Sequence, residues 1–285
     1  MKTSFKSFAS LLVAAVLVGA GGLQQAQAVL LSAYDFNGGT TPVNVVTSHS
    51  GSVYASIANS SDVPIAGVGN NSLVLGTTAG NQGIAFLPTD QVFGANSVYT
   101  FSYWVKPTSQ SITNSATILS MGANDYGVTM GINTSGQLAY WQGSYSSGTV
   151  TGAGTTLSAG TWYNVAMRFT WTNTGAHLGI TDIFINGVNK YNAYGYDTFG
   201  SLVSNNSGAL GTVAGVPPGV PGGSSYGILI DDLRFYNAPI SDAQIQADMA
   251  VAVPEPSSIA MLGMAVAGAL LFLRRRLGRR DAGVA

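Results

Sequence analysis

The sequence predicts an all-β protein, a two-sheet antiparallel β-sandwich flanked by two terminal segments that direct export. Three observations support this fold class. Short runs of alternating apolar and polar residues recur between turns rich in Gly, Asn and Ser. Helical signals are confined to one short segment near residue 245. Parallel strands would need a long, usually helical crossover between them, and no such helices are predicted.

The first 28 residues have the three parts of a secretory signal peptide. Two lysines fall within the first six residues, an apolar run extends from Phe8 to Ala20, and Ala26-Gln27-Ala28 is a small-x-small cleavage site before Val29. The run is about 13 residues long, whereas a membrane span needs about 20. A cleaved signal peptide is therefore favoured over a membrane anchor.

Residues 29–252 have the size of a single β-sandwich domain. The clearest predicted strands are Tyr99–Lys106, Tyr126–Ile132, Gln137–Trp141, Trp162–Trp171, Gly179–Ile185 and Ile228–Tyr236. Asn186-Gly187 predicts a two-residue hairpin turn. Ser241 and Gln244 match a capping box before a helix of about two turns.

Composition excludes several classes of function for this domain. Four basic residues stand against ten aspartates in residues 29–252, so its net charge is near −6 and nucleic acid is not an expected partner. The chain has no Cys, which excludes disulfides and thiol catalysis. Its one glutamate, Glu255, lies beyond the domain, so a two-Glu glycosidase pair is excluded. The G-x-S-x-G pattern at 223–227 precedes a strand, not the helix that a serine hydrolase requires.

The C-terminal residues 253–281 form a three-part tail. Pro254-Glu255-Pro256 is followed by an apolar run, Ile259–Leu273, and then by five arginines between 274 and 280. The tail resembles the PEP-CTERM sorting signal of Gram-negative bacteria, which an exosortase recognises and cleaves. The resemblance implies a precursor anchored in the inner membrane by a transmembrane helix, with its arginines in the cytoplasm. After processing, the domain is expected at the cell surface or in the extracellular matrix.

The middle of the chain also resembles a known family. The segments Tyr99–Pro107, Ile118–Gly122, Trp162–Ala166, Ile183–Gly187 and Ile230–Tyr236 occur in the order and spacing of a laminin-G-like domain, a concanavalin A-like jelly roll. One departure is that Gln244 stands where this family usually has an acidic residue. The fold hosts lectins, adhesins and hydrolases, so the resemblance alone does not decide function. A non-enzymatic protein that binds or accompanies extracellular polysaccharide is expected; the alternatives are a glycan hydrolase and a purely structural surface protein.

Asp231 and Asp232 are the candidate metal-binding residues. Strict alternation along the strand places Asp232 on one face with Arg234, and Asp231 on the other face without a basic partner. An unpaired carboxylate among apolar neighbours needs a cation or hydrogen-bond donors. Related jelly rolls often hold a structural Ca²⁺ between their first and last strands. That resemblance makes Asp35 and Asn37 candidate co-ligands of Asp231, and hydrogen-bonded structural aspartates are the alternative.

Two aromatic clusters are the candidate carbohydrate-binding residues. One contains Trp141, and the other contains Tyr194 and Tyr196. Aromatic faces stack on sugar rings, while neighbouring amides supply hydrogen bonds. The alternative is that these side chains belong to the core. Because the domain is acidic, any bound polysaccharide is expected to be neutral.

Overall fold

The computed structural model describes residues 28–251, except for 56, 66–70, 77–83, 88–97, 115, 124–125, 145–148, 175–176, 196–208 and 212–226. The predicted signal peptide, apart from Ala28, and the predicted sorting tail with its apolar run lie outside the described residues. Within the described part of the chain, no helix is long and apolar enough to span a membrane.

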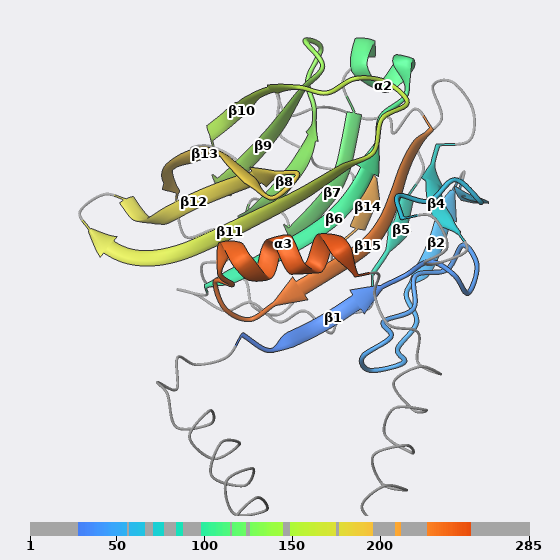
Figure 1. The fold of residues 1–285 in the computed structure, drawn as a ribbon, viewed down its shortest axis with the longest axis horizontal. Helices are drawn as coiled ribbons and strands as arrows, with labels where there is room; N and C mark the ends of the chain where they lie inside the picture. Colours follow the sequence, from blue (N-terminus) through green and yellow to red (C-terminus); the bar gives the residue numbers. More distant parts are fainter. Residues whose placement is uncertain are drawn as a thin grey trace, which may run out of the picture.

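The fold consists of two antiparallel sheets packed face to face (Figure 1). In the described residues the larger sheet has eight strands: β1 (Leu30–Tyr34), β3 (Ile57–Ser60), β4 (Ser72–Leu75), β6 (Tyr99–Lys106), β11 (Tyr163–Thr174), β12 (His177–Ile185), β13 (Val188–Gly195) and β15 (Ile228–Tyr236). Their order is β13-β12-β11-β6-β15-β4-β3, and β1 also pairs with β15. The first and last strands are therefore neighbours.

The second sheet has seven strands in the described residues: β2 (Ser52–Ala55), β5 (Ile84–Phe86), β7 (Ala116–Ala123), β8 (Tyr126–Ile132), β9 (Gln137–Ser144), β10 (Thr149–Thr156) and β14 (Ala209–Gly211). Their order is β10-β9-β8-β7-β14-β5-β2. The two sheets confirm the sandwich that the alternating patterns predict. The Asn186-Gly187 hairpin between β12 and β13 is also confirmed, because both residues have the positive φ, 50° and 71°, that a type I′ turn requires.

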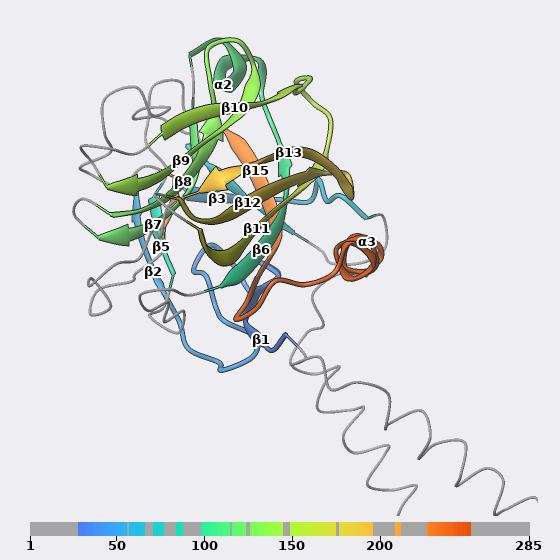
Figure 2. The ribbon, with the colours of Figure 1, turned by 90° about the vertical axis from the view of Figure 1, so that its left-hand side faces the viewer.

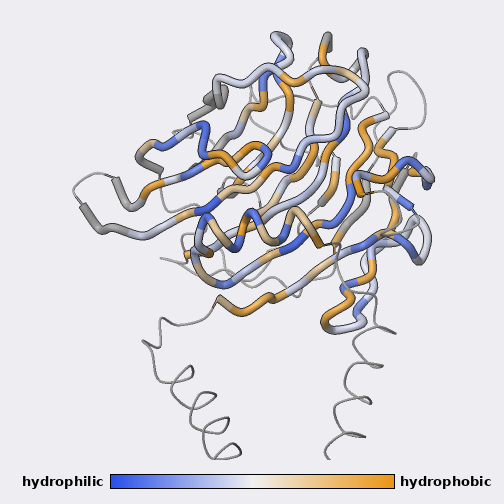
Figure 3. The backbone as a smooth tube through the Cα atoms, in the orientation of Figure 1, coloured by the Kyte–Doolittle hydropathy of each residue, from blue (hydrophilic) through white to orange (hydrophobic). Residues whose placement is uncertain are grey.

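The core fills the space between the sheets. Alternate residues of β6, among them Phe101 and Tyr103, are fully buried there, and so are Val165, Met167 and Phe169 of β11. Figure 3 shows hydrophobic and hydrophilic residues alternating along the strands. This alternation leaves the other face of the larger sheet free to carry polar side chains.

The outer face of the larger sheet is covered by α3 (Asp242–Ala250), on the side away from the second sheet (Figure 2). Its N-cap is Ser241, whose hydroxyl accepts the backbone N–H of Gln244 at 3.2 Å. The Gln244 side chain instead donates to Asp248 at 2.7 Å, so the predicted capping box forms only half of its bonds. A second helix, α2 (Ser109–Asn114), was not expected from the sequence.

The predicted alternation along β15 is wrong in its second half. Ile230, Leu233 and Phe235 all lie in the core. Strict alternation would place Ile230 and Leu233 on opposite faces of the sheet, because they are three positions apart. The cause is a β-bulge between Asp231 and Arg234, where Asp232 has φ of 48°. The bulge lies where the neighbour of β15 changes from β4 to β1. Arg234 consequently donates to the backbone carbonyl of Asp248 at 2.6 Å, on α3.

Candidate functional site

A pocket of about 560 Å³ lies on the outer face of the larger sheet, beside the start of α3. Part of its wall is apolar and comes from β1 and the segment just before it, the end of β15 and the loop before α3: Ala28, Leu30, Tyr236, Pro239 and Ile240. Ala28 and Leu30 pack here against a small hydrophobic cluster that is separate from the main core. The polar part of the wall consists of Arg168, Thr170, Asp182, Ser241 and Gln244.

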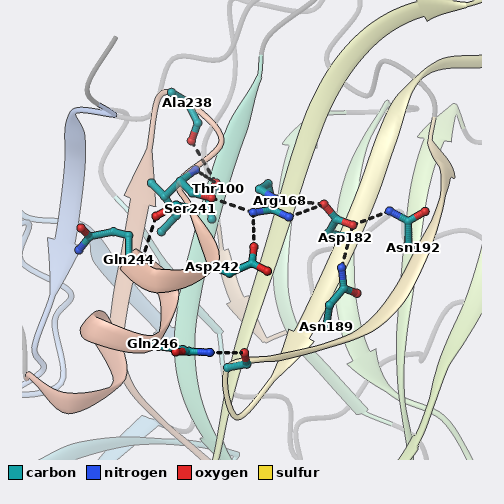
Figure 4. Close-up of polar contacts among 12 residues, drawn as sticks. Thr100, Arg168, Asp182, Asn189, Asn192, Ala238, Ser241, Asp242, Gln244 and Gln246 are labelled. Carbon is teal, nitrogen blue, oxygen red and sulfur yellow. Dashed lines mark hydrogen bonds and ion pairs between the residues drawn. The ribbon is translucent and has the colours of Figure 1, made fainter. Parts of the chain in front are cut away.

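Arg168 is the centre of the polar wall (Figure 4). It projects from β11 directly opposite Asp182 of β12, and its Nε and Nη2 groups both donate to Oδ2 of that residue, at 3.0 and 2.8 Å. Its Nη1 group donates to Asp242 at 2.7 Å and to the carbonyl of Ile240 at 2.9 Å. The guanidinium also lies over the ring of Phe184. Arg168 therefore ties two strands to the start of α3.

Asp182 is held as a carboxylate by this network. Its other oxygen, Oδ1, accepts the side-chain amides of Asn189 at 3.0 Å and Asn192 at 2.6 Å, both on β13. Burial raises the pKa of Asp182, but the hydrogen bonds from Asn192, Arg168 and Asn189 outweigh it, so the pKa lies below its ordinary value. A carboxylate stabilised in this way is a hydrogen-bond acceptor, not a proton donor, at neutral pH.

The loop that closes the pocket is fixed by Thr100 of β6. The Thr100 hydroxyl donates to the carbonyl of Ala238 at 3.0 Å and accepts the N–H of Ile240 at 3.1 Å (Figure 4). These two bonds position Pro239 and Ile240 against the sheet. The pocket wall is therefore built on rigid elements, which favours a preformed binding site.

The charges in this region limit the kind of ligand that fits. The positive charge of Arg168 is already shared between Asp182 and Asp242, so the described residues that line the pocket offer no unpaired cation to an anionic ligand. The wall combines apolar surface with hydroxyl, amide and carboxylate groups. This combination suits a neutral, hydroxyl-rich molecule, whose apolar faces and hydroxyl groups both find partners.

A second polar region lies at the bulge of β15. Asp231 is 3 % exposed, and Asp35, which follows β1, is 8 % exposed. Burial, followed by the negative charges of Asp232 and Asp35, raises the pKa of Asp231 to about 9, although the Asp232 N–H bond (2.9 Å) and the Arg234 charge lower it. Asp35 therefore lies close enough for its charge to act on Asp231, and their joint role as ligands stays a prediction.

These residues fit Ca²⁺ in their chemistry but only partly in their number. Ca²⁺ takes six to eight oxygen ligands, and two buried carboxylates supply hard oxygens with excess negative charge. The third expected ligand, Asn37, uses its side-chain oxygen to accept the N–H of Asn71 at 3.0 Å. Within the described residues no group of three or more acidic or histidine side chains is arranged to hold a metal. Ca²⁺ binding at Asp35 and Asp231 stays a proposal.

The structure describes little of the predicted aromatic sites. Trp141 lies in β9 and Tyr194 in β13, but their side chains, and Tyr196 altogether, lie outside the described part of the chain. Near them, Tyr140 and Tyr191 meet edge to face with ring centroids 5.5 Å apart, across the two sheets. Tyr140 is therefore a core residue, which was one of the alternatives for this cluster.

Sequence reasoning missed the pocket around Arg168 and Asp182. One signal was available, because Arg168 is among only four basic residues in 29–252 and alternates with the core residues Met167 and Phe169. That pattern places Arg168 on the outer face. It does not reveal that Asp182 is its cross-strand neighbour or that α3 docks beside it.

The fold and pocket define a two-sheet antiparallel β-sandwich with polar residues gathered on the outer face of one sheet. The sequence profile of the concanavalin A-like lectin/glucanases superfamily, in its laminin G form, matches residues 77–246, and the chain belongs to this family. The PEP-CTERM protein-sorting motif matches residues 252–276. The chain is therefore an exported surface protein whose motif indicates exosortase-dependent sorting.

Solved structures show the same fold at low sequence identity. Domain 4 of AbnA, a GH43 extracellular arabinanase from Geobacillus stearothermophilus, was solved in complex with arabinotriose; it is 22% identical with a TM-score of 0.57, and the match covers 78% of this chain and 98% of that one. The botulinum neurotoxin serotype G binding domain is 13% identical with a TM-score of 0.54, over 78% of this chain and half of that one. No curated protein matches the sequence.

Proposed function

We propose that the sandwich binds neutral extracellular polysaccharide without cleaving it, at the pocket around Arg168. The observation that carries this proposal is the composition of the pocket wall, in which apolar surface lies beside a fully paired Arg168–Asp182 network. The arabinotriose bound to domain 4 of AbnA gives a precedent for sugar binding on this fold. Export by the PEP-CTERM route would place the domain among such polymers.

The chemistry of the pocket favours binding over hydrolysis. Glycosidases pair a general acid of raised pKa with a second carboxylate across the scissile bond. Asp182 has a lowered pKa and four hydrogen-bond donors, so it is unsuited to protonate a leaving group. Asp231 has a raised pKa, but it is buried and does not line this pocket.

Affinity electrophoresis of the exported protein tests this proposal. Gels containing arabinan or the producer's own neutral exopolysaccharide should retard the protein, whereas a polyuronate should not. Thr170→Trp fills the pocket and should weaken retardation at least tenfold. Thr155→Trp, on β10 of the other sheet, is the matched control and should bind normally. Release of reducing ends would favour the hydrolase instead, and no retardation by any polymer would favour the purely structural protein.

The predicted aromatic platform is a second arm of this experiment. Trp141, Tyr194 and Tyr196 are proposed to stack on sugar rings, so Trp141→Ala and Tyr196→Ala should weaken binding if the platform contributes. Binding by stacking should survive high salt, because it does not depend on screened charges. Loss of binding in these variants but not in Thr170→Trp would move the site from the pocket to the platform.

Exosortase is the proposed processing partner, acting at Pro254-Glu255-Pro256. Mass spectrometry of the mature protein should find a C-terminus near Val253 to Ser257 in cells that carry the sorting protease. A strain without that protease is the control and should retain the arginine cluster. Intact arginine-containing tails on most molecules in the wild-type strain would contradict the proposal.

A further inference from the structure

The predicted signal-peptide cleavage bond, between Ala28 and Val29, lies at the wall of the pocket. Ala28 contributes to that wall and packs, together with Leu30, against a cluster that includes Tyr236, Ile240 and Ile245. A residue that is expected to leave the protein during export therefore occupies part of the proposed binding site.

Val29, on the other side of that bond, is fixed to the domain. Its N–H donates to the side-chain oxygen of Asn237 at 2.8 Å, and its carbonyl accepts the N–H of Asn237 at 3.2 Å. The next residue, Leu30, begins β1 opposite Tyr236. Because both backbone groups of Val29 are held, cleavage leaves a new N-terminus at a defined position beside the pocket.

We infer that removal of the signal peptide opens the pocket wall at Ala28 and adds an α-ammonium group at its edge, so that the exported, processed protein has the more accessible site. Hydrolysis adds water across the Ala28–Val29 amide: the C–N bond breaks, the water oxygen joins the Ala28 carbonyl carbon, and the nitrogen gains protons. The products are a carboxylate on the departing peptide and an α-ammonium on Val29. Ala28, with its methyl group, leaves the wall.

The new ammonium suits the ligand class already proposed. It keeps one bond to Asn237 and offers further N–H donors at the pocket edge, where sugar hydroxyls can accept them. Its positive charge offsets the second carboxylate on Arg168, Asp242, so the region becomes close to neutral. This inference rests on the proposed function for its ligand, but not for its geometry.

The geometry is tested without any ligand. The chain has no cysteine, so Thr170→Cys introduces a single reporter inside the pocket. Two detergent-solubilised forms are compared: the chain starting at Val29, and the same chain with Ala26-Gln27-Ala28 restored. A bulky maleimide should label the processed form at least threefold faster. Thr155→Cys, far from the pocket, should label equally in both forms. Equal labelling of Thr170→Cys would overturn the inference.

Binding then separates the inference from the proposed function. On neutral-polysaccharide gels, the form starting at Val29 should bind at least fivefold more tightly than the extended form. Acetylation of the Val29 amine should remove part of that gain. Equal binding by the two forms would overturn the inference while the proposed function stands. Faster labelling of the processed form without any polysaccharide binding would support the inference about the wall and contradict the function.

Discussion

Two groups of aspartates on the larger sheet differ in their neighbours: one carboxylate has a bonded cation and amide donors, whereas the other lies near further carboxylates. Asp182, on β12, receives four hydrogen bonds, two of them from Arg168, and its pKa is lowered. Asp231, at the bulge of β15, lies near Asp35 and Asp232 and has a pKa raised to about 9. Both residues are largely buried, with 6 % of Asp182 and 3 % of Asp231 exposed.

The difference shows that burial alone does not decide what a carboxyl group does. A cross-strand arginine turns Asp182 into a brace between β11, β12 and β13, and the same network forms the polar wall of the pocket. Without such a partner, the ionised form of Asp231 destabilises the fold unless the carboxyl group binds a proton or a cation. The first region is built for rigidity, and the second is sensitive to solution conditions.

Removal of the Arg168 guanidinium should leave Asp182 without a bonded cation, as Asp231 is. Arg168→Met leaves Asp182 buried without its ion pair, and breaking a buried pair on one side typically costs about 3–5 kcal/mol. Urea unfolding at pH 7 should show a loss of that size. Adding Asp182→Asn to the same chain should restore much of the stability. A loss below about 1 kcal/mol for Arg168→Met would mean that the pair behaves as a solvated surface pair.

Asp231 should give the protein a stability that falls as pH rises. Its pKa is raised on folding, so the folded state retains a proton that the unfolded state has lost between about pH 4 and pH 9. The free energy of unfolding should therefore fall by about 1.4 kcal/mol per pH unit in that window, in chelator. Asp231→Asn should flatten the profile and be more stable than the wild type at pH 8. A wild-type profile that is already flat would contradict the raised pKa.

A cation bound at Asp35 and Asp231 should stabilise these carboxylates, as Arg168 stabilises Asp182. If Ca²⁺ binds Asp35 and Asp231, it stabilises the fold by about 2.7 kcal/mol at a hundredfold excess over its Kd. Scanning calorimetry should show a higher Tm in millimolar Ca²⁺ than in chelator. Asp231→Asn should abolish the shift, while Asp232→Asn, the matched control, should largely keep it. An unchanged Tm in the wild type would reject the Ca²⁺ site.

The candidate sites could be predicted only in part. Asp35 and Asp231 could be paired because the laminin-G-like resemblance implied that the first and last strands are neighbours, and β1 does pair with β15. The prediction that Arg234 shares a face of β15 with Asp232 was wrong. The bulge at Asp232 moves each later residue of the strand to the face opposite the one that strict alternation predicts. The pocket around Arg168 was missed because its wall combines β1, β11, β12 and the segment before α3.

The sequence by itself determined the elements whose causes are local. Strand positions follow from period-two patterns, the β12–β13 hairpin from Asn186-Gly187, the start of α3 from Ser241, and the sorting motif from a contiguous tail. Only the tertiary structure decided the register that places Arg168 opposite Asp182, the bulge in β15 and the position of Ala28 in the pocket wall. Those features depend on packing between segments far apart in the chain, and neither a pattern nor a propensity specifies that packing.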